Sequence, residues 1–130
     1  MSTLIDRAAQ LRILVESVRR ALVVITNALE EFDVGLGNRG TYSTLQRAFH
    51  TVKSDAKHVK LGKLAAVAAT CEAIIQNASN RKLGLPLDLL RSAAEEIQKA
   101  NETISKGGRH QLDKGLMEKL VETAAAATLD

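Results

Sequence analysis

From Leu4 to Phe32, apolar side chains recur every three or four positions without a break. An α-helix repeats every 3.6 residues, so this spacing places them on one face of a helix of about eight turns. Such a helix cannot cover its own apolar face, so other elements must pack against it. The face consists of Leu4, Ala8, Leu11, Leu14, Val15, Val18, Leu22, Ile25, Leu29 and Phe32.

Three later segments show the same helical period and are separated by residues that break helices. They cover about residues 41–59, 62–79 and 86–106. Glycines and an asparagine over 33–40 indicate a loop before the first of these helices, with Thr41 or Ser43 able to cap it. Pro86 suits the first turn of the last one, because a proline lacks only a hydrogen bond that this turn does not make.

A fifth helix over about 113–127 is predicted to be weaker, because Leu116, Leu120 and an alanine run offer little to bury. Of the 130 residues, 45% are hydrophobic but only 2% are aromatic, and no alternating strand pattern occurs. This length is typical of one domain. We therefore predict a single all-α domain over residues 1–130, an antiparallel up-down four-helix bundle with an additional C-terminal helix.

Several classes of protein are disfavoured by the sequence. Cys71 is the single cysteine, which excludes an internal disulfide or a paired-cysteine zinc site, and its place on an apolar face indicates a buried structural thiol. No signal peptide and no apolar run long enough to cross a bilayer are evident, so we expect a cytoplasmic protein without a membrane partner. The glycines of Gly35–Gly40 have dinucleotide-binding spacing but follow a helix instead of a strand, so an interhelix loop explains them better.

The second predicted helix carries His50 on the side away from its apolar face. Projection at about 100° per residue places His50 beside Gln46, Lys53, Ser54 and Lys57. An exposed neutral imidazole with a fixed cation one turn away is suited to accept a phosphoryl group, because the free nitrogen attacks and the ammonium balances the phosphoryl charge. From the spacing alone, a solvated, charged helix face that happens to carry a histidine is the favoured interpretation. The apolar face consists of Leu45, Ala48, Phe49, Val52, Ala56 and Val59.

The other histidine of this region, His58, follows His50 by eight residues. The two are about 12 Å apart along a helix, so they cannot bind one metal ion, and His58 is predicted to be a surface residue. We expect no metal site and no cofactor.

The sequence HTVKS at 50–54, with LGKL at 61–64 and Glu72, resembles the histidine-containing phosphotransfer (HPt) domain. The closest likeness is to the N-terminal HPt domain of bacterial chemotaxis histidine kinases, which carry a glutamate 22 residues after the histidine. The resemblance covers nearly the whole chain, because the order of helices and of the glycine-bearing loop is also the family's. It implies that His50 exchanges a phosphoryl group with the aspartate of a response-regulator receiver domain.

The same resemblance implies roles for the neighbours of His50. Lys53 is expected to stabilise phosphoryl oxygens, and Glu72 to accept a hydrogen bond from one imidazole nitrogen so that the other stays reactive. A sensor histidine kinase is the expected phosphoryl source, since no ATP-binding lobe is present, and magnesium is expected on the receiver. The predicted partner-binding residues are Gln46, Arg47, Ser54, Lys57 and Lys60, and Lys63 belongs to the same basic rim, which Asp55 alone opposes locally.

Two positions depart from the family pattern. The family's glycine after the lysine is Ser54 here, and its glycine ten residues after the histidine is Lys60. Two alternatives therefore stay open: an HPt-like module whose histidine is not phosphorylated, and a small basic helical protein that binds nucleic acid or acts as an adaptor. The net charge of +3 is too small to favour nucleic acid, and the aromatic residues that stack on single strands are nearly absent.

Overall fold

The computed structural model describes residues 3–81 and 84–129, with side chains over 6–81 and 84–126. Five α-helices account for most of this part of the chain, and no strand occurs in it. The helices are α1 (Thr3–Asp33), α2 (Arg39–His58), α3 (Gly62–Arg81), α4 (Leu87–Ser105) and α5 (Lys114–Leu129). None of the described helices is long and apolar enough to pass through a bilayer.

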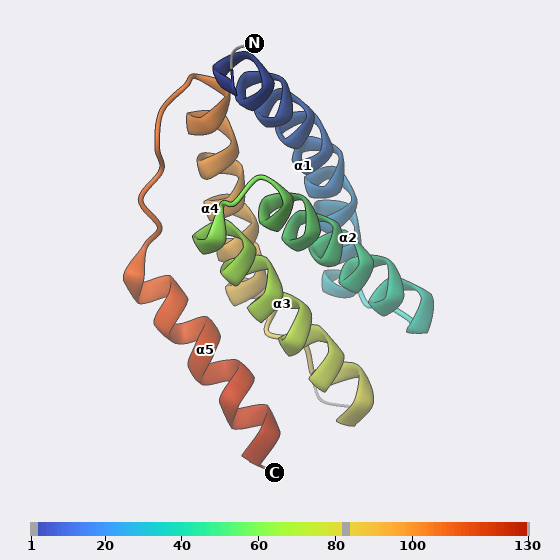
Figure 1. Ribbon diagram of the computed structural model, residues 1–130. Helices are drawn as coiled ribbons and strands as arrows, with labels where there is room; N and C mark the ends of the chain where they lie inside the picture. The colour runs from blue at the N-terminus through green and yellow to red at the C-terminus, as the bar shows by residue number, and fades with distance from the viewer. Residues whose placement is uncertain (1–2, 82–83, 130) are drawn as a thin grey trace.

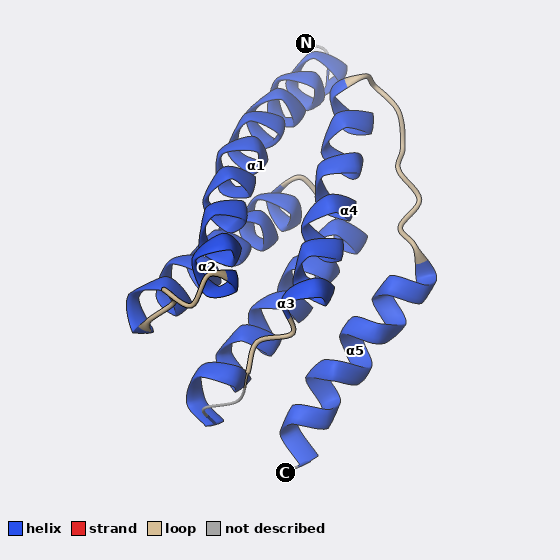
Figure 2. Ribbon diagram, turned by 180° about the vertical axis from the view of Figure 1, so that it is seen from behind, coloured by secondary structure: helices blue, strands red, loops and turns tan. Residues whose placement is uncertain are grey.

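The first four helices form an antiparallel bundle, in which each helix packs on the one before it and α4 closes the ring against α1 (Figure 1). The fifth helix lies along α3 and also contacts α4. Figure 2 shows the long connection that runs back from the end of α4 to the start of α5. The predicted fold class, a four-helix bundle with an additional C-terminal helix, is confirmed.

The core is built from the apolar faces that the sequence predicts. Phe49 and Leu45 of α2 are fully buried, and they belong to one apolar cluster that also contains Leu14 and Ile25 of α1 and Ile75 of α3. All six residues predicted for the apolar face of the second helix are buried. On α3 the buried face includes Leu64, Ala68, Cys71, Ile75 and Ala78. Burial of large aliphatic and aromatic side chains is the main stabilising term of such a bundle, at about 1.5–3 kcal/mol for each.

The predicted face of α1 needs one correction. Ala8 is exposed, because it lies beside an open hollow where α4 has already ended at Ser105. Leu4, the first predicted core residue, lies outside the described side chains.

The loop between α1 and α2 is organised by Asn38, and the prediction of Thr41 or Ser43 as the cap is wrong. The Asn38 side chain accepts a hydrogen bond from the Thr41 backbone, while the Thr41 hydroxyl accepts one from the Asn38 backbone, at 3.1 Å each. This reciprocal pair satisfies two donors that a helix start leaves unpaired. Gly37 lies so close to the ring of Phe32 that any Cβ there would meet it at 2.1 Å.

The end of α2 fixes the direction of α3. Leu61 donates its backbone N–H to the Ala56 carbonyl at 2.8 Å and Lys60 donates to Lys57 at 3.0 Å, the two bonds of a Schellman motif. The motif needs a left-handed residue, which here is Lys60, with φ 63°. Arg7 of α1 also donates to the Val59 carbonyl at this end. Lys60 therefore occupies the position for which glycine is best suited.

The α5 helix is anchored more firmly than its sequence predicts. Leu120 is fully buried, so the expectation that this helix offers little to bury is wrong for that residue. Asp113 caps the helix by accepting from the backbone N–H of Gly115 at 2.9 Å. The buried carboxylate of Glu96 on α4 pairs with His110 Nε2 at 2.7 Å and accepts from the Asp113 backbone at 3.1 Å.

Pro86, predicted inside the first turn of α4, is instead the residue before it.

Candidate functional site

His50 lies in the middle of α2 and points away from the core. Its sequence neighbour Phe49 is fully buried, and so is Val52. Their burial fixes the rotation of α2 about its axis and leaves 54% of the His50 side chain exposed to solvent. The predicted outward position of His50 is confirmed.

Glu72 on α3 joins the two polar residues of α2. Its Oε2 lies 2.8 Å from His50 Nδ1, and its Oε1 accepts a hydrogen bond from Lys53 Nζ at 2.6 Å. Because α2 and α3 are antiparallel neighbours, residues 22 positions apart in sequence meet side by side. The structure therefore brings together all three residues for which a role in phosphotransfer is predicted.

The Glu72 carboxylate is ionised at neutral pH. Its partial burial raises the pKa, but the hydrogen bonds from Lys53 and His50, together with their charges, outweigh that effect and hold the pKa below the ordinary value of 4.5. An ionised carboxylate has no hydrogen to donate. The proton of the His50–Glu72 bond therefore resides on Nδ1, and in a neutral ring the lone pair is on Nε2.

Lys53 is held one helical turn after His50 by its contact with Glu72. Its side chain is only 22% exposed, so it is more confined than a typical surface lysine. An ammonium group has three N–H donors, and the bond to Glu72 uses one of them. Lys53 is thus restrained beside the imidazole while it keeps the capacity to bind an anionic oxygen.

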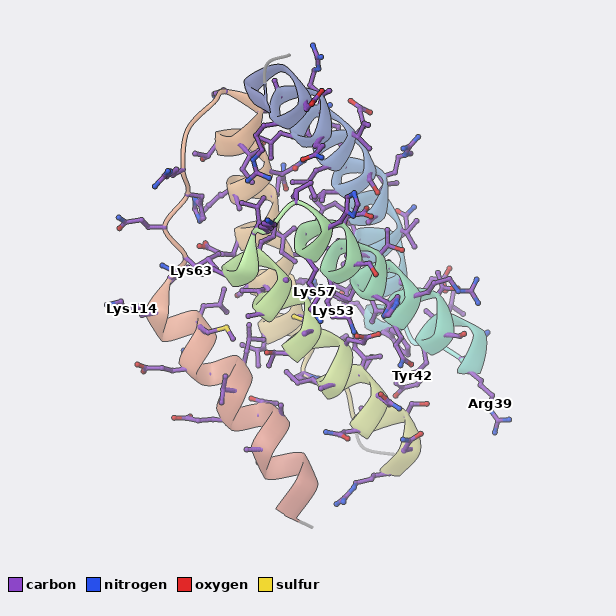
Figure 3. The ribbon with its side chains drawn as sticks, in the orientation of Figure 1. Arg39, Tyr42, Lys53, Lys57, Lys63 and Lys114 are labelled. Carbon is purple, nitrogen blue, oxygen red and sulfur yellow. The ribbon has the colours of Figure 1, made fainter. Side chains whose placement is uncertain are left out.

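The predicted partner-binding residues surround His50 on the outer face of α2. Gln46, Arg47, Ser54 and Lys57 lie three, four or seven positions from His50, the spacing that places residues on one helix face. Gln46 is half-buried, and the other three, like Lys60 at the end of the helix, are exposed. Figure 3 shows Lys57 and Lys63 near one end of α2, with Arg39 at the other end.

Positive charge is concentrated on this segment. Residues 39–63 contain six lysines and arginines and one acidic residue, Asp55, so the segment has a net charge of +5. The whole chain has a net charge of +3. The rest of the chain is therefore negative by two charges. Asp55 accepts a hydrogen bond from Ser17 of α1 and so lies on the flank of α2 next to α1, away from His50. Sequence reasoning missed this contact, because nothing in the pattern pairs residues 38 positions apart.

The remaining candidates lie away from this site. Cys71 is fully buried, and burial raises the pKa of its thiol to about 12, so it is the structural residue predicted. His58 is exposed at the last turn of α2, as expected. The Gly35–Gly40 segment follows α1 and runs into the first turn of α2, which begins at Arg39, so the loop interpretation is confirmed for residues 35–38. Among the residues with described side chains, no three His, Cys, Asp or Glu residues lie close enough to hold a metal ion.

Comparison with known proteins gives one match. The family model described as the Hpt domain matches residues 10–127, which is most of the chain and includes all five helices in whole or in large part. No curated protein and no solved structure matches the chain significantly.

Proposed function

The chain belongs to the Hpt domain family, whose members carry phosphoryl groups between kinases and receiver domains, and we propose that His50 is its phosphoryl acceptor. The observation that carries the proposal is the His50–Glu72 hydrogen bond at Nδ1, on a ring that is 54% exposed. This bond leaves Nε2 as the nitrogen with a lone pair. The proposed nucleophile is therefore Nε2 of His50.

The proposed step moves one phosphoryl group and no proton. The Nε2 lone pair of neutral His50 attacks the phosphorus of an aspartyl phosphate, the N–P bond forms, and the P–O bond to the receiver aspartate breaks to release its carboxylate. The imidazole keeps its Nδ1 hydrogen and becomes positive. Glu72, whose Oε2 is 2.8 Å from Nδ1, stabilises that charge through the same hydrogen bond.

Lys53 is the proposed electrostatic partner of the transferred group. Its ammonium is restrained by Glu72 one turn from His50, so little side-chain entropy is lost when it binds a phosphoryl oxygen. The chain needs no cofactor for this step, and the magnesium ion belongs to the receiver.

The proposed partner is the receiver domain of a response regulator, with a sensor histidine kinase as the original phosphoryl source. The net charge of +5 on residues 39–63 attracts an acidic partner and raises the rate of encounter. Gln46, Arg47, Ser54, Lys57 and Lys60 are the proposed contact residues. Among HPt domains we propose the chemotaxis-kinase type, because Glu72 stands 22 residues after His50 and contacts it. We also propose that residues 1–130 form one HPt-like domain and that this domain is cytoplasmic.

A phosphotransfer assay tests this function. Receiver domains from the source organism are phosphorylated with acetyl phosphate and mixed with the wild-type chain or with His50→Gln, His58→Gln and His110→Gln. Only the His50 substitution should abolish labelling of the chain. If no receiver labels the wild type, or if His58→Gln abolishes labelling while His50→Gln keeps it, His50 is not the acceptor.

A further inference from the structure

The outer face of α2 carries different side chains on the two sides of His50. Lys53 donates a hydrogen bond to Glu72 of α3, so it marks the side toward α3. Asp55 accepts a hydrogen bond from α1, so it marks the side toward α1. At about 100° per residue, Ser54 is turned about 40° from His50 toward the Asp55 side, whereas Lys53 is turned about 60° the other way. Ser54 and Lys53 therefore lie on opposite sides of the histidine.

The hydrogen bond to Glu72 also sets the direction of the two ring nitrogens of His50. Nδ1 points toward α3, because Glu72 belongs to that helix. Nδ1 and Nε2 lie on opposite sides of the line that runs from Cβ through the imidazole ring. Nε2 therefore points outward and away from α3, to the side on which Ser54 lies. A phosphoryl group bonded to Nε2 would extend over that side.

The Ser54 hydroxyl has the capacity to bind a new acceptor. Hydroxyls within a helix can donate to the carbonyl four residues earlier, as Thr51 does to Arg47 at 3.1 Å and Thr70 does to Ala66 at 2.8 Å. Ser54 is exposed, and its hydroxyl makes no hydrogen bond to any residue that the structure describes. Its donor is therefore not committed to the backbone of α2.

Ser54 is also close enough to His50 to contact a group on the ring. Residues four positions apart on a helix have Cβ atoms about 5–6 Å from each other. Each Cα–Cβ bond tilts toward the helix N-terminus, so the Ser54 side chain leans back toward the turn of His50. The resemblance to HPt domains implies a glycine at this position, and glycine has no side chain to donate. A hydroxyl beside the histidine is therefore a feature of this chain.

We propose that the Ser54 hydroxyl donates a hydrogen bond to the phosphoryl group carried by Nε2 of His50, an inference that rests on the proposed function. Lys53 then approaches the phosphoryl oxygens from the α3 side and Ser54 from the α1 side. A hydrogen bond to a phosphoryl oxygen is charge-assisted, so it is stronger than one between neutral groups. It forms as negative charge arrives at the ring, so it favours both the transfer to His50 and the phosphorylated product.

Phosphoramidate tests this inference without a partner protein. The Nε2 lone pair attacks its phosphorus, the N–P bond to His50 forms, and the P–N bond of phosphoramidate breaks. The departing nitrogen already carries three hydrogens, so it leaves as ammonia without a proton transfer.

The variants to compare differ in which hydroxyl they lose. Ser54→Ala removes the proposed donor, and the variant should stay folded because alanine is the better helix former. Thr51→Ala is the matched control, since the Thr51 hydroxyl lies next to His50 in sequence but is already bonded to a backbone carbonyl. Circular dichroism confirms that each variant is folded.

The rate of His50 phosphorylation by phosphoramidate should fall about threefold to tenfold in Ser54→Ala, the loss expected for one hydrogen bond exposed to solvent. The rate for Thr51→Ala should equal that of the wild type. Phosphorus NMR of the phosphorylated chain gives a second readout. A hydrogen bond donated to the phosphoryl oxygens favours their more highly charged form, so the pH midpoint of the phosphorus chemical shift should be higher in Ser54→Ala than in the wild type.

Equal rates and equal pH midpoints for Ser54→Ala and the wild type overturn the inference and leave the proposed function intact. A variant that is slower with a phosphorylated receiver but normal with phosphoramidate assigns Ser54 to partner contact alone, which also overturns the inference. Failure of both phosphoramidate and receivers to label wild-type His50 overturns the proposed function itself.

Discussion

Replacement of Lys60 by glycine should remove backbone strain from the end of α2. Lys60 adopts φ 63° in the Schellman motif that ends α2. A left-handed conformation costs a residue with a Cβ about 1–2 kcal/mol, and glycine does not have that cost. Glycine loses more backbone entropy on folding, by roughly 0.5–1 kcal/mol relative to alanine, which offsets part of the gain. The net stabilisation expected from the backbone is about 0.5–1 kcal/mol.

Loss of the lysine charge has its own effect, so Lys60→Ala is the matched control. A cation at a helix C-terminus stabilises by about 0.3–1 kcal/mol, and both substitutions remove it. The alanine variant keeps the strained backbone and should be less stable than the wild type. The glycine variant should be more stable than the alanine variant by about 0.5–1 kcal/mol, which corresponds to roughly 2–4 °C in Tm for a chain of this length.

Urea denaturation followed by circular dichroism measures this difference, because the chain has no tryptophan to report by fluorescence. The urea midpoint should be higher for Lys60→Gly than for Lys60→Ala, and the slope of the free energy of unfolding against urea should be similar in the two variants. A glycine variant no more stable than the alanine variant would refute the left-handed assignment of residue 60. It would also remove the physical reason for the glycine that the resemblance to HPt domains implies at this position.

Three further substitutions test the site, the encounter with the receiver and the loop between α1 and α2. Glu72→Gln should make the stability of the fold less dependent on pH. The lowered pKa of Glu72 stabilises the folded state above about pH 4.5, and this contribution is lost as the pH falls through the folded-state pKa. Urea denaturation midpoints measured from about pH 3 to pH 7 should therefore vary less in the variant than in the wild type. Lys57→Glu should slow association with a receiver several-fold and weaken the dependence of the rate on ionic strength, as measured by stopped flow, because an exposed cation steers the encounter. Gly37→Ala should destabilise the fold by about 1–3 kcal/mol in the same urea assay, since the new Cβ meets the Phe32 ring; unchanged stability would show that the ring moves aside freely.

The helices and their faces could be predicted from the sequence because both depend on local spacing. His50 was predicted to face outward from the same periodicity that buries Phe49 and Val52, and the structure confirms it. Contact between His50 and Glu72 followed from resemblance and from antiparallel packing, and it too is confirmed.

Features that depend on tertiary structure could not be read from local patterns. The burial of Leu120 depends on α5 packing against α3, and the anchor of α5 depends on Glu96, a residue on a different helix. The N-cap of α2 is Asn38, whereas Thr41 or Ser43 is predicted from the sequence. All three residue types can cap a helix, and the local sequence does not rank them. The register of α1 against α2 becomes visible only through the Ser17–Asp55 and Glu31–Thr41 hydrogen bonds.

The central claim is that His50 accepts a phosphoryl group at Nε2 while Nδ1 stays bonded to Glu72. Phosphorus and nitrogen NMR of the ¹⁵N-histidine-labelled chain, after reaction with a phosphorylated receiver, tests it most directly. We expect one acid-labile phosphorus signal, coupled to Nε2 of a single histidine and absent from His50→Gln. A signal coupled to Nδ1, or one that survives in His50→Gln and disappears in His110→Gln, would contradict it.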